Sequence, residues 1–184
     1  LLDSFEGLLE RPIIQDELEK KHAALVQAIG HDIKVVQELF LSYRDAPPIA
    51  TNMPPISGAL DWCRGLVTRI QQPMDCLRRL HKSSMEREEA KEVNKLFVSL
   101  MTSLEEYKMQ KIEEWGRDVE SSSQAKLKLP LLRRDDETRL LSVNFDKDLD
   151  KLLREVKYFL ILGLAVPDSA LQIYKKFEVF RQQT

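Results

Sequence analysis

The sequence is poor in glycine, histidine and cysteine, with six, three and two of these residues in a chain of 184. Few glycines together with 32% charged residues are typical of long, solvated helices and argue against an enzyme rich in loops. Hydrophobic residues make up 43% of the chain, which is enough for a packed core. The length allows one or two domains, or several helical layers of something longer.

The two cysteines, Cys63 and Cys76, do not have the spacing of a disulfide. Within one helix their separation corresponds to roughly 20 Å, at a rise of about 1.5 Å per residue, which is too far for the two sulfur atoms to bond. We therefore expect free, buried thiols of an intracellular protein.

Long apolar runs and an excess of either charge are also absent. The longest apolar run, Tyr158 to Val166, is interrupted by Gly163 and is about half of the roughly 20 residues that a membrane span needs. The net charge of −2 gives no general attraction to nucleic acid or to an anionic membrane. We expect no nucleic-acid binding and no membrane insertion.

The ends suggest an internal fragment of a larger protein. The chain opens without Met or a secretory signal and stops within the helical pattern of residues 180–184.

The usual signatures of catalysis and of metal or cofactor binding are missing. His22, His31 and His81 are scattered over charged stretches, without the spacing of metal ligands. Neither a nucleophile elbow nor a glycine-rich phosphate loop is present, and the carboxylate pairs lie in charged stretches with nothing to desolvate them. We expect no catalytic, cofactor or metal site. A helical enzyme is a minor alternative, and it would need a buried carboxylate pair in a pocket.

The first long helix is predicted from Pro12 to about Arg44, where Pro47 and Pro48 stop it. A packing seam is expected at a heptad spacing, with six apolar side chains among its eight positions, 18, 22, 25, 29, 32, 36, 39 and 43. His22 and Asp32 interrupt this seam. His22 could be a ligand or a switch, but a solvated or hydrogen-bonded histidine at the edge of a helix face is far commoner.

Two further long helices follow a stiff, proline-rich connector. The second helix begins at Ile56 and continues through a kink at Pro73, and we expect Trp62 near its start to be largely buried. Its apolar stripe comprises Ala59, Leu60, Cys63, Leu66, Val67, Ile70, Met74 and Leu77. The third helix begins after a capping box at Ser83 and ends near Glu120, before a flexible break at 121–123. Its stripe comprises Val93, Phe97, Leu100, Leu104, Tyr107, Ile112, Trp115 and Val119.

The hydrophobic period then changes from helical to alternating. Residues 126–134 and 139–145 are predicted to form a β-hairpin around a turn at 135–138. Asp146 is placed to cap an amphipathic helix that Gly163 ends, and Pro167 starts the last helix.

These elements predict a mostly α fold, with elongated bundle layers of long antiparallel helices and one small inserted β-hairpin. The segments expected are a helical hairpin end with the first long helix, the proline-rich connector, two long bundle helices, the β-hairpin, and the capped helix with the turn and the start of the next helix, over residues 1–45, 46–55, 56–123, 124–145 and 146–184.

Several motifs resemble the tail of dynein heavy chains. Residues 52–66 read NMPPISGALDWCRGL and 69–74 read RIQQPM, followed by LLRRDDETRLLSVNFD at 131–146 and LREVKY at 153–158. FEGLLERPII at 5–14 is similar too, so that the resemblance covers nearly the whole chain. NMPP together with GLAVPDSA at 163–170 looks more axonemal than cytoplasmic. One departure is Arg139, where the family's hairpin turn leads us to expect glycine.

The resemblance implies structural roles for the motif residues, which are Asn52, Pro54, Pro55, Gly58, Trp62, Pro73, Asn144, Phe145, Asp146, Arg154, Glu155, Tyr158, Gly163 and Pro167. It implies a non-catalytic tail segment of a microtubule-motor ATPase that links the motor to its cargo, which in a cilium is the doublet microtubule. The implied partners are other heavy chains, intermediate and light chains, and docking proteins of the doublet. The alternative is a generic spectrin-like helical rod or adaptor.

Overall fold

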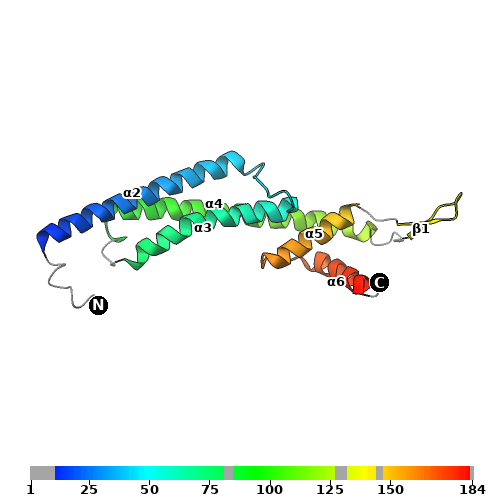
Figure 1. The fold of residues 1–184 in the computed structure, drawn as a ribbon. Coiled ribbons are helices and arrows are strands. Elements are labelled where there is room, and N and C mark those ends of the chain that lie inside the picture. Colours follow the sequence, from blue (N-terminus) through cyan, green and yellow to red (C-terminus); the bar gives the residue numbers. More distant parts are fainter. Residues whose placement is uncertain (1–10, 81–84, 127–131, 144–146, 183–184) are drawn as a thin grey trace. The chain divides into compact units, whose positions relative to one another are not determined.

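The computed structural model describes residues 11–80, 85–126, 132–143 and 147–182. Its described residues form five helices and two short strands (Figure 1). In chain order these are α2 (Pro12–Tyr43), α3 (Pro55–Arg79), α4 (Glu88–Lys126), β1 (Leu132–Arg134), β2 (Leu141–Val143), α5 (Lys147–Ile161) and α6 (Asp168–Gln182). The mostly helical fold is therefore confirmed. No helix among the described residues is long and apolar enough to cross a membrane.

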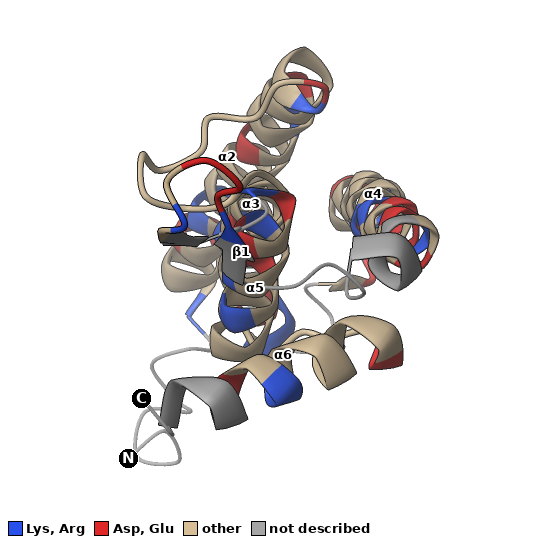
Figure 2. Cartoon of the chain, turned by 90° about the vertical axis from the view of Figure 1, so that its right-hand side faces the viewer, with Lys and Arg blue, Asp and Glu red and all other residues tan. Residues whose placement is uncertain are grey.

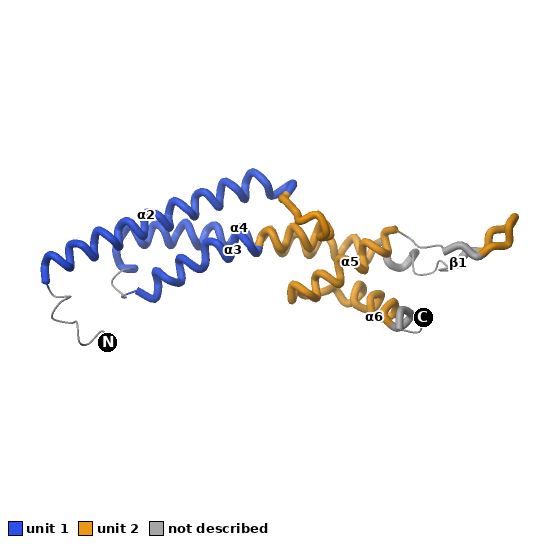
Figure 3. The backbone as a smooth tube through the Cα atoms, viewed as in Figure 1, with its two compact units in different colours: residues 1–46, 64–105 blue, residues 47–63, 106–184 orange. Residues whose placement is uncertain are grey.

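The chain forms two compact units, and α3 and α4 each contribute to both (Figure 3). Unit 1 consists of residues 1–46 and 64–105, and unit 2 consists of residues 47–63 and 106–184. Each unit therefore combines two segments that are distant in the sequence. In unit 2 the proline-rich connector and the start of α3 belong with the last third of the chain.

Unit 1 buries one face of each of its three helices. The stripes predicted for the second and third helices are confirmed in this unit, and α3 continues through Pro73 to Arg79. Within unit 1, the buried side chains of these two helices are Leu66, Ile70, Met74, Leu77, Ala90, Val93, Phe97, Leu100 and Leu104. A Cβ added to Gly30 of α2 would lie 3.0 Å from Cγ2 of Val93, so α2 and α4 approach each other closely there.

The seam predicted for α2 is wrong in phase. The buried residues of this helix are Val26, Ile29, Gly30, Ile33, Val36 and Phe40. Only Ile29 and Val36 belong to the predicted set, whereas Leu18, Leu25 and Tyr43 are exposed. The helix carries two apolar faces, and periodicity does not select between them. Asp32 lies at the edge of the buried face, where its carboxylate accepts hydrogen bonds from Arg69 and raises the pKa of that guanidinium.

Three further predictions about these helices are corrected. Helix α4 runs to Lys126, so the expected break at residues 121–123 is absent, and the Ser121 hydroxyl instead donates to the backbone oxygen of Asp118 at 2.9 Å. Each serine lowers the stability of a helix by only a few tenths of a kcal/mol, and neighbouring residues that favour helix can offset this loss. Both cysteines are free, as expected. Cys63 is buried, but Cys76 is exposed, contrary to the prediction. Trp62 is only partly buried. The expected cap Ser83 lies outside the described residues.

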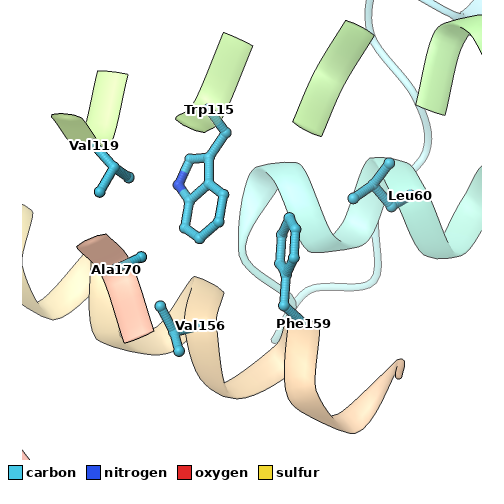
Figure 4. Close-up of a cluster of buried hydrophobic side chains, with 6 residues drawn as sticks. All are labelled: Leu60, Trp115, Val119, Val156, Phe159 and Ala170. Carbon is cyan, nitrogen blue, oxygen red and sulfur yellow. The ribbon is translucent and has the colours of Figure 1, made fainter. Parts of the chain in front are cut away.

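The core of unit 2 is an aromatic cluster between α3, α4, α5 and α6 (Figure 4). Trp115 and Phe159 stack with ring centroids 4.5 Å apart and an interplanar angle of 28°. The remaining buried members are Leu60, Val119, Val156 and Ala170. Stacked aromatic pairs contribute about 0.5–1.5 kcal/mol beyond their buried area, so this pair is the main packing anchor of the unit.

Strands β1 and β2 pair antiparallel, with Leu132 opposite Val143 and Arg134 opposite Leu141. The pairing covers three residues of each strand, which is much shorter than the strands expected over 126–134 and 139–145. Residues 127–131 and 144–146 of the expected segment lie outside the described residues, as does the expected cap Asp146. Arg139, where we expected glycine, adopts the left-handed conformation with φ of 57°.

The loop between the strands is held by its first residue. The Asp135 carboxylate accepts hydrogen bonds from the backbone N–H groups of Thr138 at 2.8 Å and Glu137 at 2.9 Å, which lower the pKa of Asp135. The N–H of Asp135 donates to the oxygen of Leu140 at 2.9 Å, closing the loop.

Replacing Arg139 by glycine is expected to stabilise the hairpin by about 1 kcal/mol, because a side chain in the left-handed conformation costs roughly that much. Amide hydrogen exchange at Asp135 should slow down in this variant. The matched control is Arg134→Gly within β1, which should speed up the same exchange. A faster exchange in Arg139→Gly would contradict the strain assigned to Arg139.

Helix α5 ends as the sequence predicts. Gly163 has φ of +68°, and the N–H groups of Leu164 and Gly163 donate to the oxygens of Phe159 at 2.9 Å and Leu160 at 3.2 Å. This is the Schellman pattern, which requires a left-handed residue just after the helix. Pro167 then directly precedes α6, and its oxygen accepts the N–H of Leu171 at 3.0 Å.

Gly163→Ala is expected to lower the free energy of unfolding by about 1 kcal/mol, because alanine is strained at this φ. Gly65→Ala is the control of opposite sign: a Cβ there meets nothing within 4 Å, in the interior of α3. That variant should gain up to about 1 kcal/mol. Urea denaturation of both variants measures the difference, and equal effects would refute the assignment.

Candidate functional site

The most distinctive polar arrangement of the described residues is the start of α3. Pro55 is its first helical residue and has no N–H to satisfy, while the N–H of Gly58 donates to the oxygen of Pro54 at 2.8 Å. The N–H groups of Ile56 and Ser57 are the two donors that α3 itself leaves without an acceptor. A third group must supply their acceptor, because Ser57 is buried.

Glu155 of α5 supplies that acceptor. Its Oε1 accepts the N–H of Ile56 at 2.8 Å and its Oε2 accepts the N–H of Ser57 at 2.9 Å. The Ser57 hydroxyl also donates to Oε2. Glu155 is only 4% exposed, so these are charge-assisted hydrogen bonds away from water, at the positive end of the α3 dipole. One carboxylate therefore caps a helix that begins about a hundred residues earlier in the chain.

Two neighbours of Glu155 hold the connector itself. Nη2 of Arg154 and the hydroxyl of Tyr158 both donate to the backbone oxygen of Asn52, at 3.3 and 3.2 Å. The connector also packs against α3, because a Cβ on Gly58 would lie 2.0 Å from Cγ2 of Ile49. We call this set the helix joint; it comprises Asn52, Ile56, Ser57, Arg154, Glu155 and Tyr158.

The hydrogen bonds of the helix joint connect three segments of the chain, which are the connector, the start of α3 and one turn of α5. Both oxygens of the Glu155 carboxylate accept hydrogen bonds, Oε1 from one backbone N–H group and Oε2 from another and from a hydroxyl. Among the described residues Glu155 is the only buried acidic side chain, so they show no buried carboxylate pair of the kind that the enzyme alternative requires. Among the described residues, no group of three or more His, Cys, Asp or Glu side chains could hold a metal ion.

Comparison with known proteins decides the family. The whole chain, residues 1–184, matches the family described as dynein heavy chain, N-terminal region 1. The chain belongs to the dynein heavy-chain family. It is 39% identical over 216 aligned residues to the dynein beta chain of the flagellar outer arm of Chlamydomonas reinhardtii. It is 30% identical to the ciliary dynein beta chain of Tripneustes gratilla and 30% identical to human dynein axonemal heavy chain 9.

These matches cover 100%, 99% and 99% of this chain but only 5%, 4% and 4% of the three relatives. The chain thus corresponds to a small part of a dynein heavy chain, within its N-terminal region. The predicted resemblance to the heavy-chain tail is confirmed.

The structure brings half of the dynein motif residues together. Those at the helix joint or beside it are Asn52, Pro54, Pro55, Gly58, Arg154, Glu155 and Tyr158. Gly163 and Pro167 lie at the two ends of the turn between α5 and α6, and Pro73 lies within the part of α3 that belongs to unit 1. Asn144, Phe145 and Asp146 lie outside the described residues. The structural roles assigned to these residues stay predictions.

Trp62 does not have the place that we expected. It is partly buried and contacts Tyr107 edge-on, with ring centroids 6.3 Å apart. The tryptophan in the core of this dynein segment is Trp115, which is 7% exposed. Trp62 lies one residue from the centre of the buried stripe of α3, and a step of about 100° around the helix turns it toward the rim.

Sequence reasoning also missed the burial of Glu155 and the part played by Ser57. A signal was present, since Glu155 lies in phase with Leu152, Val156 and Phe159 on the apolar face of α5. An acidic residue on an apolar helix face needs donors, and the nearest strong donors in a helical fold are helix N-termini.

Gly58→Ala is expected to destabilise the chain by about 1–3 kcal/mol, because the added methyl group overlaps Ile49. Since the clash is with one side chain, the second substitution Ile49→Ala should recover most of the loss. Thermal denaturation of the single and double variants measures this coupling. If Gly58→Ala loses the same stability with either residue at position 49, the close packing of the connector on α3 is refuted.

Proposed function

We propose that this chain is a non-catalytic tail segment of an axonemal dynein heavy chain, working in the axoneme of cilia or flagella. It acts as part of an elongated structural arm that links an ATP-driven microtubule motor to its cargo, which in cilia is the doublet microtubule. The family match supports the tail assignment, and the flagellar, ciliary and axonemal names of the relatives support the subtype. A generic spectrin-like rod is the weaker candidate, because the match to a dynein region spans every residue.

The helix joint is the observation that carries the mechanical part of this proposal. An arm under load needs fixed angles between its elements, and a connector of free loops would bend. Here the connector oxygen at Asn52 and the first turn of α3 are both bonded to one turn of α5. Hydrogen bonds to a charged group contribute about 1.5–3 kcal/mol each when buried, which applies to the bonds of Glu155, whereas the two bonds at Asn52 are exposed and contribute less. The joint therefore resists changes of angle between the connector, α3 and α5.

The partners proposed are other dynein heavy chains, intermediate and light chains, and docking proteins of the doublet. Acidic and basic residues are interspersed along the helices (Figure 2), which suits protein partners of mixed charge more than nucleic acid or an anionic membrane. We propose neither a cofactor nor membrane insertion for this segment.

The test measures axonemal incorporation and ATPase activity separately, so that a defect of the structural arm can be told from a defect of the motor. A heavy chain that contains this segment is expressed in ciliated cells as wild type, Glu155→Ala and the exposed control Lys157→Ala. We expect Glu155→Ala to reduce the amount of heavy chain and intermediate chain that sediments with the axoneme by several-fold. The ATPase activity per purified heavy chain should stay unchanged, and Lys157→Ala should match wild type in both assays.

Two results would contradict the proposal. Normal axonemal incorporation of Glu155→Ala, with the variant confirmed to be destabilised, would show that the segment carries no assembly role. ATP hydrolysis by the isolated 184-residue chain would refute its non-catalytic character.

A further inference from the structure

Strands β1 and β2 form a sheet of only two strands, so each strand has one edge that pairs with no other strand among the described residues. A hairpin with three residues in each strand buries little surface and is only marginally stable by itself. An unpaired edge presents a row of backbone N–H and C=O groups, which can form hydrogen bonds with a further strand. The hairpin is therefore a place where another strand can be added.

The register shows which backbone groups point outward. The N–H of Asp135 donates to the oxygen of Leu140 at 2.9 Å, so these two residues form a hydrogen-bonded pair. Such pairs alternate with pairs that exchange no hydrogen bond in an antiparallel ladder, and the next pair is Arg134 with Leu141. The N–H and C=O groups of Leu141 thus lie on the outer edge of β2. Those of Val143, two positions further along the strand, lie on the same edge.

The two edges differ in charge. Strand β1 carries Arg133 and Arg134, whereas residues 140–143 read Leu-Leu-Ser-Val and carry no charge. Charged side chains on an edge strand oppose edge-to-edge pairing, and like charges directly opposite each other destabilise a strand pair. Strand β2 lacks this protection, and Leu140 beside it is 69% exposed. The β2 edge is therefore the one that suits a further strand.

We propose that the β2 edge pairs antiparallel with the β2 edge of a second copy of this chain. A two-fold axis at Ser142 places Leu141 of one copy opposite Val143 of the other, on both sides of the axis. Both of these residues have outward backbone groups, so each pair exchanges two hydrogen bonds and all three residues of β2 are paired. The two hairpins then form one four-stranded sheet, which is more stable than an isolated hairpin.

The other ways of joining two hairpins are less favourable. A two-fold axis at the centre of β1 would place Arg133 opposite Arg133 of the second copy, where the like charges repel. Pairing of β2 with β1 of the next copy would leave an open edge at each end and would continue into a filament. The β2 pair is closed and brings no charges together. It follows from the register and the charge of the hairpin alone, so it does not depend on the function proposed above.

Disulfide cross-linking tests the pairing at one position. The Cα atoms of a pair without hydrogen bonds are about 4.5 Å apart, which a disulfide can span. In a Cys76→Ser background, which leaves only the buried Cys63, Ser142→Cys should therefore form a disulfide between two copies on mild oxidation. Arg133→Cys, opposite Ser142 on β1, is the matched control and should stay monomeric. A cross-linked dimer of Arg133→Cys, or no dimer of Ser142→Cys, would overturn the proposal.

Two proline variants separate the contact between copies from the hairpin itself. Leu141→Pro removes an outward N–H from each copy and leaves the hydrogen bonds between β1 and β2 intact. It should weaken association about ten-fold, which corresponds to the loss of two ordinary hydrogen bonds. Arg134→Pro removes the outward N–H directly across the hairpin, on β1, and should leave association unchanged. Amide hydrogen exchange at Asp135 shows in both variants that the hairpin is still closed.

Sedimentation of the 184-residue chain at increasing concentration measures this association without a cross-link. The proposal expects a reversible dimer, which Leu141→Pro weakens and Arg134→Pro does not. A wild-type chain that stays monomeric, or that associates into species larger than a dimer, would overturn the proposal. Equal weakening by the two proline variants would do the same.

Discussion

Replacing Glu155 by alanine is expected to lower the free energy of unfolding by about 2–4 kcal/mol, because each buried donor left without an acceptor costs about 1–3 kcal/mol. The substitution removes the acceptor of two backbone N–H groups at the start of α3 and of the Ser57 hydroxyl. Water has little access to replace it, since Ser57 is fully buried. Chemical denaturation of the 184-residue chain measures the loss.

Two further variants separate the charge from the shape. Glu155→Gln keeps one acceptor oxygen but turns an amide donor toward the N–H groups, so it should lose about half as much or more. Lys157→Ala, an exposed neighbour on α5, should stay within about 0.5 kcal/mol of wild type. If Glu155→Ala is as harmless as Lys157→Ala, the cap contributes nothing to folding.

Trp115→Ala is expected to cost about 3–5 kcal/mol, the usual effect of removing a large aromatic side chain from a core. Trp115 stacks on Phe159 and joins the cluster that binds α3, α4, α5 and α6 together. The cavity left behind is lined by residues of four helices, which cannot all move inward at once. Thermal or urea denaturation, followed by circular dichroism, measures the effect.

Trp62→Ala is the matched control for this prediction. The same substitution removes the same atoms, but Trp62 is partly solvated and touches Tyr107 only edge-on. We expect less than half of the loss caused by Trp115→Ala. Equal losses in the two variants would mean that the aromatic cluster is not the main core of unit 2.

Helix positions and two of the three apolar stripes follow from the sequence alone. On α3 and α4 most apolar residues lie on one face, although Leu96, Val98 and Met109 of α4 are exposed, and a period of 3.6 residues therefore predicts the buried stripe. On α2 the apolar residues form two faces, and burial depends on which partner lies on which side. The periodicity of α2 does not tell which of its two apolar faces is buried. The predicted seam followed Leu18 and Leu25, whereas the buried face contains Val26 and Ile33.

The stop and start signals between α5 and α6 could also be predicted, since they are local. Glycine is the residue that adopts the left-handed conformation of position 163 at the lowest cost. Proline lacks an N–H group, so Pro167 is tolerated at a helix start but not in a helix interior. Arg139 shows the limit of the same rule. Its left-handed conformation is enforced by the loop that Asp135 closes, although the residue type does not favour it.

The helix joint could be predicted only in part. The family resemblance selected Asn52, Gly58, Arg154, Glu155 and Tyr158, but it gave no contacts between them. Their pairing spans about a hundred residues, and long-range pairing depends on how the helices pack. Only the phase of Glu155 on an apolar face hinted that this carboxylate would be buried.

Amide hydrogen exchange at Ile56 and Ser57 tests the central claim, that one carboxylate of α5 fixes the start of α3, most directly. In the wild-type chain both N–H groups should exchange slowly, unlike the first-turn amides of an uncapped helix. In Glu155→Ala both should exchange rapidly while the core amides of α4 stay protected. Fast exchange at both positions in wild type, or unchanged protection in Glu155→Ala, would contradict the account.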